Sequence, residues 1–327
     1  MIFMKIKFSK FTEYALTIII ILTINFFIPR LMPGDPFVIL SGDNGCEISA
    51  YSQEQIEKYK TYYGLDKPIH IQYLNYIKNL CYGNLGYSIY YNDSVFNIIK
   101  SRFGWTLMLV LTSIFFSSIL GTLIGTLSSF NKDKKLDRIL YSFFMTLSEI
   151  PGFLLGIIFL FILAGKLNLF PLSGAITDFQ EYASNYEKAK DIIYHATLPI
   201  LTLTLSKVGD FYLISRNSAI SVLKKDYINT AKAKGLKRRK IIFKHILRNS
   251  ILPVITKIFL TIGSVVSGAI LVENVFCYPG LGKLMKEAVF VRDYPLIQGI
   301  FLVVTFMVIV MNLISDKLYK KLDPRVG

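Results

Sequence analysis

Glu149, Lys207 and Asp210 are charged residues inside long apolar stretches of the sequence, where the movement of an ion or a charged solute would need them. Lys207 and Asp210 are three positions apart, so on a helix they share one face and can form an ion pair. Glu149 precedes Pro151, and a proline there would bend the helix and open a gap beside the carboxylate. A bare charge at the centre of a bilayer costs roughly 2.5–3.5 kcal/mol, so these side chains should face protein or water. They are candidates for a translocation path or a proton relay, and a structural ion pair or a plain helix kink are the alternatives.

No motif for catalysis or for metal binding accompanies these charges. The sequence lacks the phosphate-binding loop Gly-x-x-x-x-Gly-Lys-Ser/Thr, the Gly-x-Ser-x-Gly nucleophile turn and the zinc-binding His-Glu-x-x-His helix. The histidines, His70, His195 and His245, are scattered along the chain, so no metal site is predicted. If transport depends on ATP, the ATPase must be another chain.

One strongly basic segment, residues 226–240, has an order that favours docking onto another protein; we call it the coupling segment. The small residues Ala231 and Ala233 belong to a predicted helix that Gly235 should end, and a second basic helix follows at 237–248. A short helix with small side chains can approach another protein closely, while long basic side chains pair with acids at the rim. The alternative is a basic loop that only fixes topology.

The apolar residues are gathered into blocks that predict a membrane protein. The chain has 327 residues, of which 53% are apolar and 18% charged, a balance too apolar for an ordinary soluble domain. A spanning helix needs ~20 mostly apolar residues, because it must cross ~30 Å of hydrocarbon. Six stretches meet this requirement: residues 11–28, 103–130, 139–164, 197–215, 251–272 and 296–315. We therefore expect an all-α, polytopic membrane protein with six transmembrane helices.

The distribution of Lys and Arg predicts the orientation of these spans. The amino-terminal residues, the turn after the second span, residues 216–248 and the carboxyl-terminal residues hold most of the basic side chains, whereas the opposite segments are close to neutral. Both termini are therefore expected in the cytoplasm. The net charge of +15 marks this cytoplasmic face rather than a nucleic-acid site. The first span lacks a small-residue cleavage pattern, so we expect an uncleaved signal anchor.

The spans divide the chain into three predicted parts: residues 1–28 with the cytoplasmic N-terminus and first span, an extracytoplasmic loop subdomain at 29–102, and a five-helix core at 103–327 that carries the coupling segment. In the outer loop, one helix should open at Ser52-x-x-Gln55 and a second should cover 69–80, before turns at Gly83 and Gly86. The three cysteines all fall on this outer side: Cys46, Cys81 and Cys277. A disulfide between the first two, and three free thiols, are both open.

Several motifs in combination resemble permease subunits of ATP-binding-cassette importers, most closely the dipeptide/oligopeptide/nickel branch of the binding-protein-dependent inner membrane components. Residues 230–235, preceded by Asp226-Tyr227 and followed by Leu252-Pro253, resemble that group's coupling motif. The other matching motifs lie at residues 31–36, 63–69, 83–86 and 278–282. The likeness runs almost from end to end. It departs where the general coupling motif opens with Glu, because this chain has Asn229-Thr230.

The resemblance implies the type I importer permease (MetI-like) fold and a cytoplasmic helix that contacts an ATPase. The residues that match the coupling motif are Asp226, Thr230, Ala231, Ala233, Gly235 and Leu236. The chain itself would be a transporter subunit without enzyme activity or bound cofactor, since ATP and Mg belong to two cytoplasmic ATP-binding subunits. The other implied partners are a second homologous permease and an extracytoplasmic substrate-binding protein. The implied location is the inner membrane of a prokaryotic cell.

Peptides are the leading substrate that the resemblance implies, and nickel or a metal chelate is the second. A different class of transporter would be driven by protons through Glu149, Lys207 and Asp210. Such a transporter would keep working without an ATPase, and it would be expected to show inverted repeats, which six unequal loops do not suggest. A channel would need a filter-like loop, and none is visible.

Overall fold

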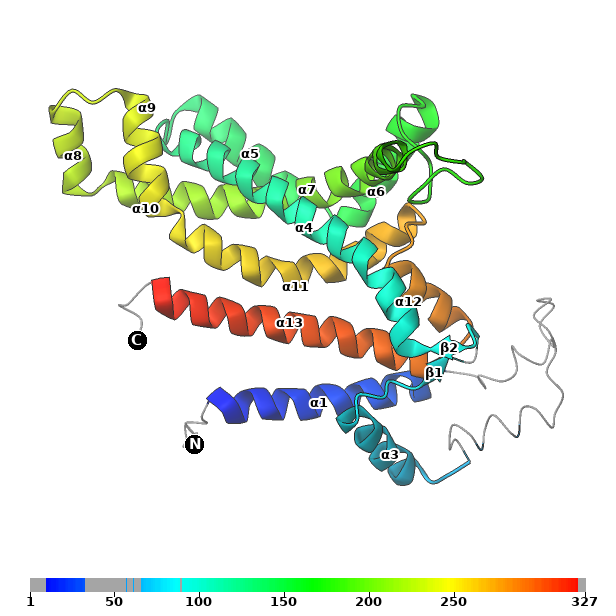
Figure 1. Cartoon of the computed structure of the whole chain (residues 1–327). Coiled ribbons are helices and arrows are strands. Elements are labelled where there is room, and N and C mark those ends of the chain that lie inside the picture. Colours follow the sequence, from blue (N-terminus) through cyan, green and yellow to red (C-terminus); the bar gives the residue numbers. More distant parts are fainter. Residues whose placement is uncertain (1–9, 33–56, 58–60, 62–65, 89, 323–327) are drawn as a thin grey trace. The chain divides into compact units, whose positions relative to one another are not determined.

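A computed structural model of the chain is mostly helical (Figure 1). It describes residues 10–32, 57, 61, 66–88 and 90–322. The helices are α1 Lys10–Leu31, α3 Ile69–Cys81, α4 Val95–Ser129, α5 Lys135–Glu149, α6 Gly152–Phe159, α7 Asn185–Leu223, α8 Asp226–Ala233, α9 Arg238–Lys240, α10 Arg248–Ser250, α11 Leu252–Val275, α12 Leu281–Phe290 and α13 Tyr294–Leu322. Two π-helices, η1 Leu160–Lys166 and η2 Ile241–Leu247, continue α6 and α9. A short hairpin pairs β1 Tyr87–Ser88 with β2 Asp93–Ser94 in antiparallel register.

Helices cover all six predicted spans to within one residue at the ends, except that the span at 139–164 is broken at residues 150–151. By length and hydropathy, α4, α11 and α13 can each cross a membrane, and a fourth candidate is α5 followed by α6 and η1, which is bent by 96° at the break. In α1 the apolar part is shorter, Ala15–Leu31. The span predicted at 197–215 lies inside α7, which is long enough to cross but not apolar enough to qualify, because Lys207 and Asp210 interrupt it.

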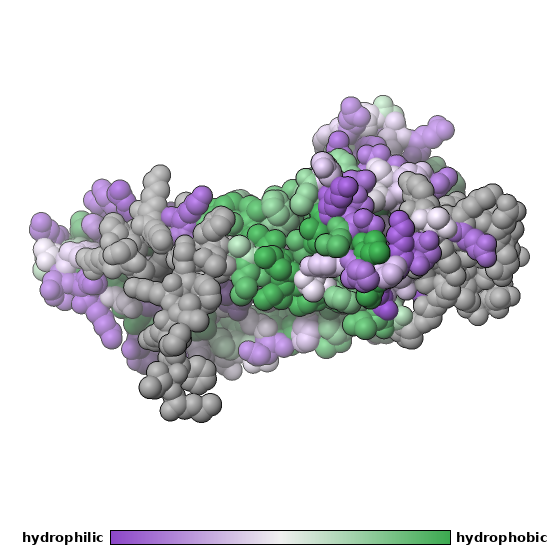
Figure 2. Space-filling model, turned by 90° about the horizontal axis from the view of Figure 1, so that it is seen from below, coloured by the Kyte–Doolittle hydropathy of each residue, from purple (hydrophilic) through white to green (hydrophobic). Residues whose placement is uncertain are grey.

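Much of the apolar surface of the spans is exposed in the isolated chain. Only 44% of the most apolar part of α4 and 22% of that of α13 is buried. Leu16, Ile19 and Ile24 of α1 are likewise each more than half exposed. Figure 2 shows hydrophobic side chains gathered over the middle of one face, between hydrophilic stretches. Surfaces of this kind require lipid or another membrane protein as their environment.

One compact unit comprises Met1–Ser101 and Leu284–Phe306. Phe26 of α1 is fully buried there, with its ring centroid 5.2 Å from that of Tyr73 and 5.6 Å from that of Tyr76 on α3. The adjacent Asn25 donates from its amide to the Tyr76 hydroxyl (3.2 Å) and to the Gln298 carbonyl of α13 (2.9 Å). These contacts hold α1, α3 and the start of α13 together.

The outer-loop elements that the structure describes match their predicted positions. The helix expected at 69–80 is α3, and Gly83 and Gly86 have φ values of +73° and +92°, which confirms the turns. The helix expected from Ser52 lies almost wholly outside the described residues. After the turns, the Ser88 hydroxyl donates to the Asp293 carboxylate at 2.5 Å. The same carboxylate caps α13 by accepting the backbone N–H of Leu296 (3.2 Å).

The second compact unit, Arg102–Lys283 with Met307–Gly327, is built around α7. This helix packs against α5, α6 and α11. On α4, Gly121 and Gly125 are four residues apart, so they bring one face of α4 directly onto α7. A methyl group built on Gly121 would lie 2.6 Å from the Val208 carbonyl oxygen, and one on Gly125 would overlap the Tyr212 carbonyl oxygen. Close backbone contact therefore fixes α4 against α7.

The close α4–α7 contact predicts the effect of one added methyl group. Gly125→Ala should destabilise the chain by about 1–3 kcal/mol, because the obstructing atoms belong to the α7 backbone and cannot rotate away. The measurement is thermal unfolding of the detergent-solubilised protein. Gly104→Ala on the same helix is the matched control, since nothing lies within 4 Å of its Cβ position. Equal unfolding temperatures for the two variants would contradict the proposed packing.

Candidate functional site

The coupling segment forms a short helix with a defined end. Helix α8 covers Asp226–Ala233, and Gly235 follows with φ +68°, which confirms that this glycine ends the helix. The backbone N–H of Leu236 donates to the Ala231 carbonyl (3.3 Å), as in a Schellman cap. Because an L side chain is strained at such a φ, the glycine is required by the geometry of the cap itself.

One face of α8 is packed inside the second unit. Ile228 is fully buried and Ala231 is 5% exposed, in an apolar cluster with residues of α7 and η2. Leu236 packs against the same cluster. The members of this cluster from the two neighbouring helices are Ala219, Val222, Ile241 and Ile246. The small size of Ala231 is therefore explained by packing between helices.

The opposite face of α8 is open. Asp226, Thr230, Ala233 and Gly235 are exposed, and so is Tyr227. The six residues predicted for coupling thus divide into four that can contact another protein and two, Ala231 and Leu236, that support the helix from below. The predicted docking interpretation applies only to the exposed group.

The second basic helix predicted at 237–248 is formed by α9, η2 and α10 in succession. Together with the turn after α8 it lines an open pocket of about 700 Å³. The cationic side chains of this pocket are Lys237, Arg239, Lys240 and Lys244, with Phe243 among them. An acidic surface that contacts the exposed face of α8 would find these cations beside it.

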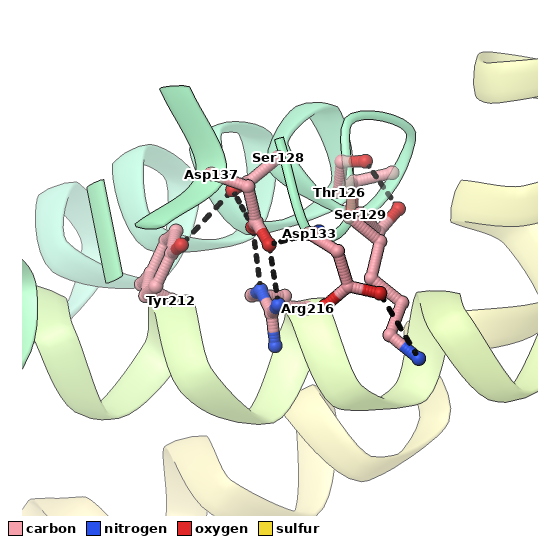
Figure 3. Close-up of polar contacts among 8 residues, drawn as sticks. Thr126, Ser128, Ser129, Asp133, Asp137, Tyr212 and Arg216 are labelled. Atoms are coloured by element: carbon pink, nitrogen blue, oxygen red, sulfur yellow. Dashed lines mark hydrogen bonds and ion pairs between the residues drawn. The ribbon is translucent and has the colours of Figure 1, made fainter. Parts of the chain in front are cut away.

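A buried ion pair that the sequence analysis missed joins α5 to α7 (Figure 3). The Arg216 guanidinium donates two hydrogen bonds to the Asp137 carboxylate, at 2.7 Å from Nε and 2.6 Å from Nη2. The Ser128 hydroxyl of α4 donates to the same carboxylate at 2.6 Å, and the backbone N–H of Asp133 donates at 3.1 Å. The only indication of this pair in the sequence is that Asp137 is an acidic residue in the short basic turn after the second predicted span.

The charges inside the spans pair differently from the prediction. Asp210 of α7 forms an ion pair with Lys257 of α11, with 3.5 Å between carboxylate oxygen and ammonium nitrogen. No ion pair joins Lys207 to Asp210 within the part of the chain that the structure describes. The predicted pair is therefore wrong, and Lys257 reaches across to α7 because α11 packs against this helix.

Glu149 is exposed at the last position of α5, where the helix breaks before Pro151. This confirms the predicted bend. The break lies against the charged part of α7, since a Cβ on Gly152 would contact Ser206 at 3.4 Å and one on Gly209 would overlap Ser148. The structure thus brings the neighbours of Glu149 onto the stretch of α7 that holds Lys207 and Asp210.

The carboxylate of Asp191, near the start of α7, is hydrogen-bonded to the loop that precedes this helix. Asp191 accepts hydrogen bonds from the Thr177 backbone N–H (2.7 Å) and the Tyr182 hydroxyl (2.6 Å), and the latter bond raises the pKa of Tyr182. These contacts fasten a loop to the start of α7.

Among the described residues, no group of three or more His, Cys, Asp or Glu side chains could hold a metal ion. Cys81 and Cys277 are exposed free thiols, and Cys46 lies outside the described residues.

Comparison with known proteins supports one family along nearly the whole chain. The model of the binding-protein-dependent transport system inner membrane component matches residues 117–327, and the model of its N-terminal part matches residues 3–110. Among solved structures, a chain of the MetNI methionine ABC transporter in an inward-facing conformation aligns with a TM-score of 0.56 and 14% identity. That alignment covers 69% of this chain and 96% of the other, and it shows a shared fold.

Curated relatives agree with the family models. The oligopeptide transport system permease protein AppB of Bacillus subtilis is 36% identical over 96% of this chain and 97% of its own length. The dipeptide transport system permease protein DppB of Escherichia coli is 33% identical over 95% of each chain. OppB of Haemophilus influenzae is 34% identical over 99% of each. The chain is therefore a multi-pass membrane permease that belongs to the family of binding-protein-dependent transport system inner membrane components.

Proposed function

We propose that this chain is a permease subunit of an ATP-driven importer of di- or oligopeptides. The observation that carries the proposal is the similarity over at least 95% of the chain to permeases named for dipeptide and oligopeptide transport, at 33–36% identity. Nickel, the other substrate considered from the sequence, has no comparable support among these relatives. A proton-driven mechanism is not favoured, because the family is one of binding-protein-dependent systems.

The proposal assigns ATP and Mg to other subunits. The absence of a phosphate-binding loop in the sequence supports a division of labour in which two cytoplasmic ATP-binding subunits hydrolyse the nucleotide. A second, homologous permease completes the membrane part, and an extracytoplasmic binding protein delivers the peptide to the subdomain at 29–102. Both termini and α8 lie on the cytoplasmic side, as the distribution of basic residues indicates.

In this mechanism the exposed face of α8 receives the movement of the ATPase. Ile228 and Ala231 connect α8 to the end of α7, so displacement of α8 also displaces α7. The Asp137–Arg216 pair then carries the movement to α5. Glu149, Lys207 and Asp210 lie on these two helices and form the polar part of the translocation path. By reciprocity, a peptide that favours one arrangement of the helices must alter ATP turnover.

Peptide transport is tested by deleting the gene for this chain and measuring uptake of a labelled tripeptide. Uptake should fall to the background of the host and return with a plasmid copy, because the membrane path is lost and regained. Uptake of nickel in the same cells serves as the control and should stay unchanged. Normal peptide uptake together with lost nickel uptake would reverse the choice of substrate.

The docking role of α8 is tested by Ala233→Glu on its exposed face. The variant should reach the membrane in normal amount, yet lose copurification of the ATP-binding subunits and peptide uptake, because a longer charged side chain prevents close approach. Lys134→Glu, an exposed position in the turn before α5, is the control for a changed charge and should keep both. Wild-type copurification and uptake in Ala233→Glu would refute docking at this face.

Removing one partner of the buried Asp137–Arg216 ion pair should strongly destabilise the protein. Asp137→Ala leaves the Arg216 charge without its partner at a site where the Asp side chain is 2% exposed, so the free energy of unfolding should fall by about 3–5 kcal/mol. The double variant Asp137→Ala/Arg216→Met should recover part of this loss. Thermal unfolding in detergent measures both.

The exposed Lys132–Asp133 pair provides the control for this measurement. Its side chains are 47% and 77% exposed, so Lys132→Ala should change stability by only ~0–1 kcal/mol. A similar small effect from Asp137→Ala would show that the buried pair does not stabilise the α5–α7 contact.

A further inference from the structure

The ion pair between Asp210 and Lys257 differs in kind from the one between Asp137 and Arg216. Its single contact is 3.5 Å long, and its side chains are 39% and 34% exposed. The Asp137–Arg216 pair has two short hydrogen bonds, with side chains 2% and 13% exposed. The Asp137–Arg216 pair is thus fixed and buried, whereas the Asp210–Lys257 pair is loosely held and accessible.

The location of the accessible pair limits what can lie beside it. Asp210 and Lys257 fall within the spans at 197–215 and 251–272, where contact with lipid is costly for a charge. Their exposed surface must therefore face water or another protein. A structural ion pair is stabilised by short, paired hydrogen bonds, and this pair has a single contact of 3.5 Å. We take its exposed side to be open to a water-filled path.

The charges near this pair balance one another. α7 contributes Lys207 and Asp210, α11 contributes Lys257, and Glu149 lies at the α5 break that packs against α7. Two positive and two negative groups give no net charge. Such a site does not favour a simple cation or a simple anion over its opposite. It fits a solute that carries one charge of each sign, as a peptide with free ends does.

We propose that Asp210 and Lys257 form an exchangeable ion pair that binds the two charged ends of the passing peptide. Resting on the proposed peptide transport, this inference names the groups that recognise the solute inside the membrane. The peptide ammonium binds Asp210 and its carboxylate binds Lys257, so one ion pair is exchanged for two and no charge is left bare. The ends of an extended dipeptide lie roughly 7 Å apart, so the Lys257 side chain must swing away from Asp210.

The decisive variant removes both charges of the pair at once. In Asp210→Asn/Lys257→Met no unpaired charge remains, so the assembled transporter, with its ATPases, partner permease and binding protein, should copurify as the wild type does. Uptake of a labelled dipeptide with free ends should nevertheless fall roughly tenfold or more, because the charge-assisted hydrogen bonds to both ends of the peptide are lost. Lys132→Met, in an exposed pair outside the path, is the control.

The single variants assign the two ends of the peptide. Equilibrium binding to the purified permease–ATPase complex, without the binding protein, compares one dipeptide in free, N-acetylated and C-amidated form. Asp210→Asn should weaken binding of the free and C-amidated forms roughly tenfold. Binding of the N-acetylated form should stay unchanged, because only the N-acetylated form lacks the ammonium. Lys257→Met should weaken binding of the free and N-acetylated forms and leave binding of the C-amidated form unchanged.

Other results distinguish a failure of the proposed exchange from a failure of the proposed peptide transport. If the wild type takes up no peptide, the proposed function itself fails. If the wild type transports peptides and the double variant does so equally well, the exchange is refuted and peptide transport stands. A double variant that no longer copurifies with its partners would show a structural pair, and it would overturn the exchange too.

Discussion

A charge at membrane depth must be given a partner or water, and α7 is organised by this constraint. The helix has 39 residues and is therefore about 58 Å long, nearly twice the thickness of the hydrocarbon layer. Its charged residues Asp210 and Arg216 are each paired with a residue of another helix. The two pairs differ, since that of Arg216, just beyond the predicted span at 197–215, is sealed among protein atoms, whereas that of Asp210, inside the span, is left accessible.

Close backbone packing makes α7 a rigid connection between these pairs. Gly121 and Gly125 bring α4 onto one side of it, and Gly209 brings the α7 backbone against Phe144 of α5. The Phe144 and Tyr212 rings then stack, with centroids 4.8 Å apart. In a lipid environment such contacts replace the hydrophobic effect as the source of helix association. A displacement of α8 therefore has a continuous, well-packed route to the helices that carry the charges.

Local features were predictable from the sequence, and contacts between helices were not. The breaks at Pro151 and Gly235 follow from residues whose backbone conformations are restricted or permissive, so neighbours in sequence decide them. Helix α3 follows from the proline and the glycine turns that bound it, and the helices at the six apolar stretches follow from composition. The partner of Asp210 depends on how α7 and α11 are rotated about their axes, which no local pattern specifies. For the same reason Ala231 could not be assigned to the buried face, and Asp137 could not be paired with Arg216.

The departure of this chain from the general coupling motif can be understood from the two faces of α8. A Glu at the start of the motif would place an acid on the exposed face, where Asn229 and Thr230 now stand. Asp226 is then the one carboxylate of α8, and the neighbouring pocket is lined by four cations. In the proposed docking, charge pairing would come mainly from these cations meeting acids of the ATPase. On the exposed face of α8, Tyr227, Thr230 and Ala233 would then supply close contact rather than charge. In the proposed complex, the basic pocket would thus orient the partner by charge, and the adjoining exposed face of α8 would make the close contact.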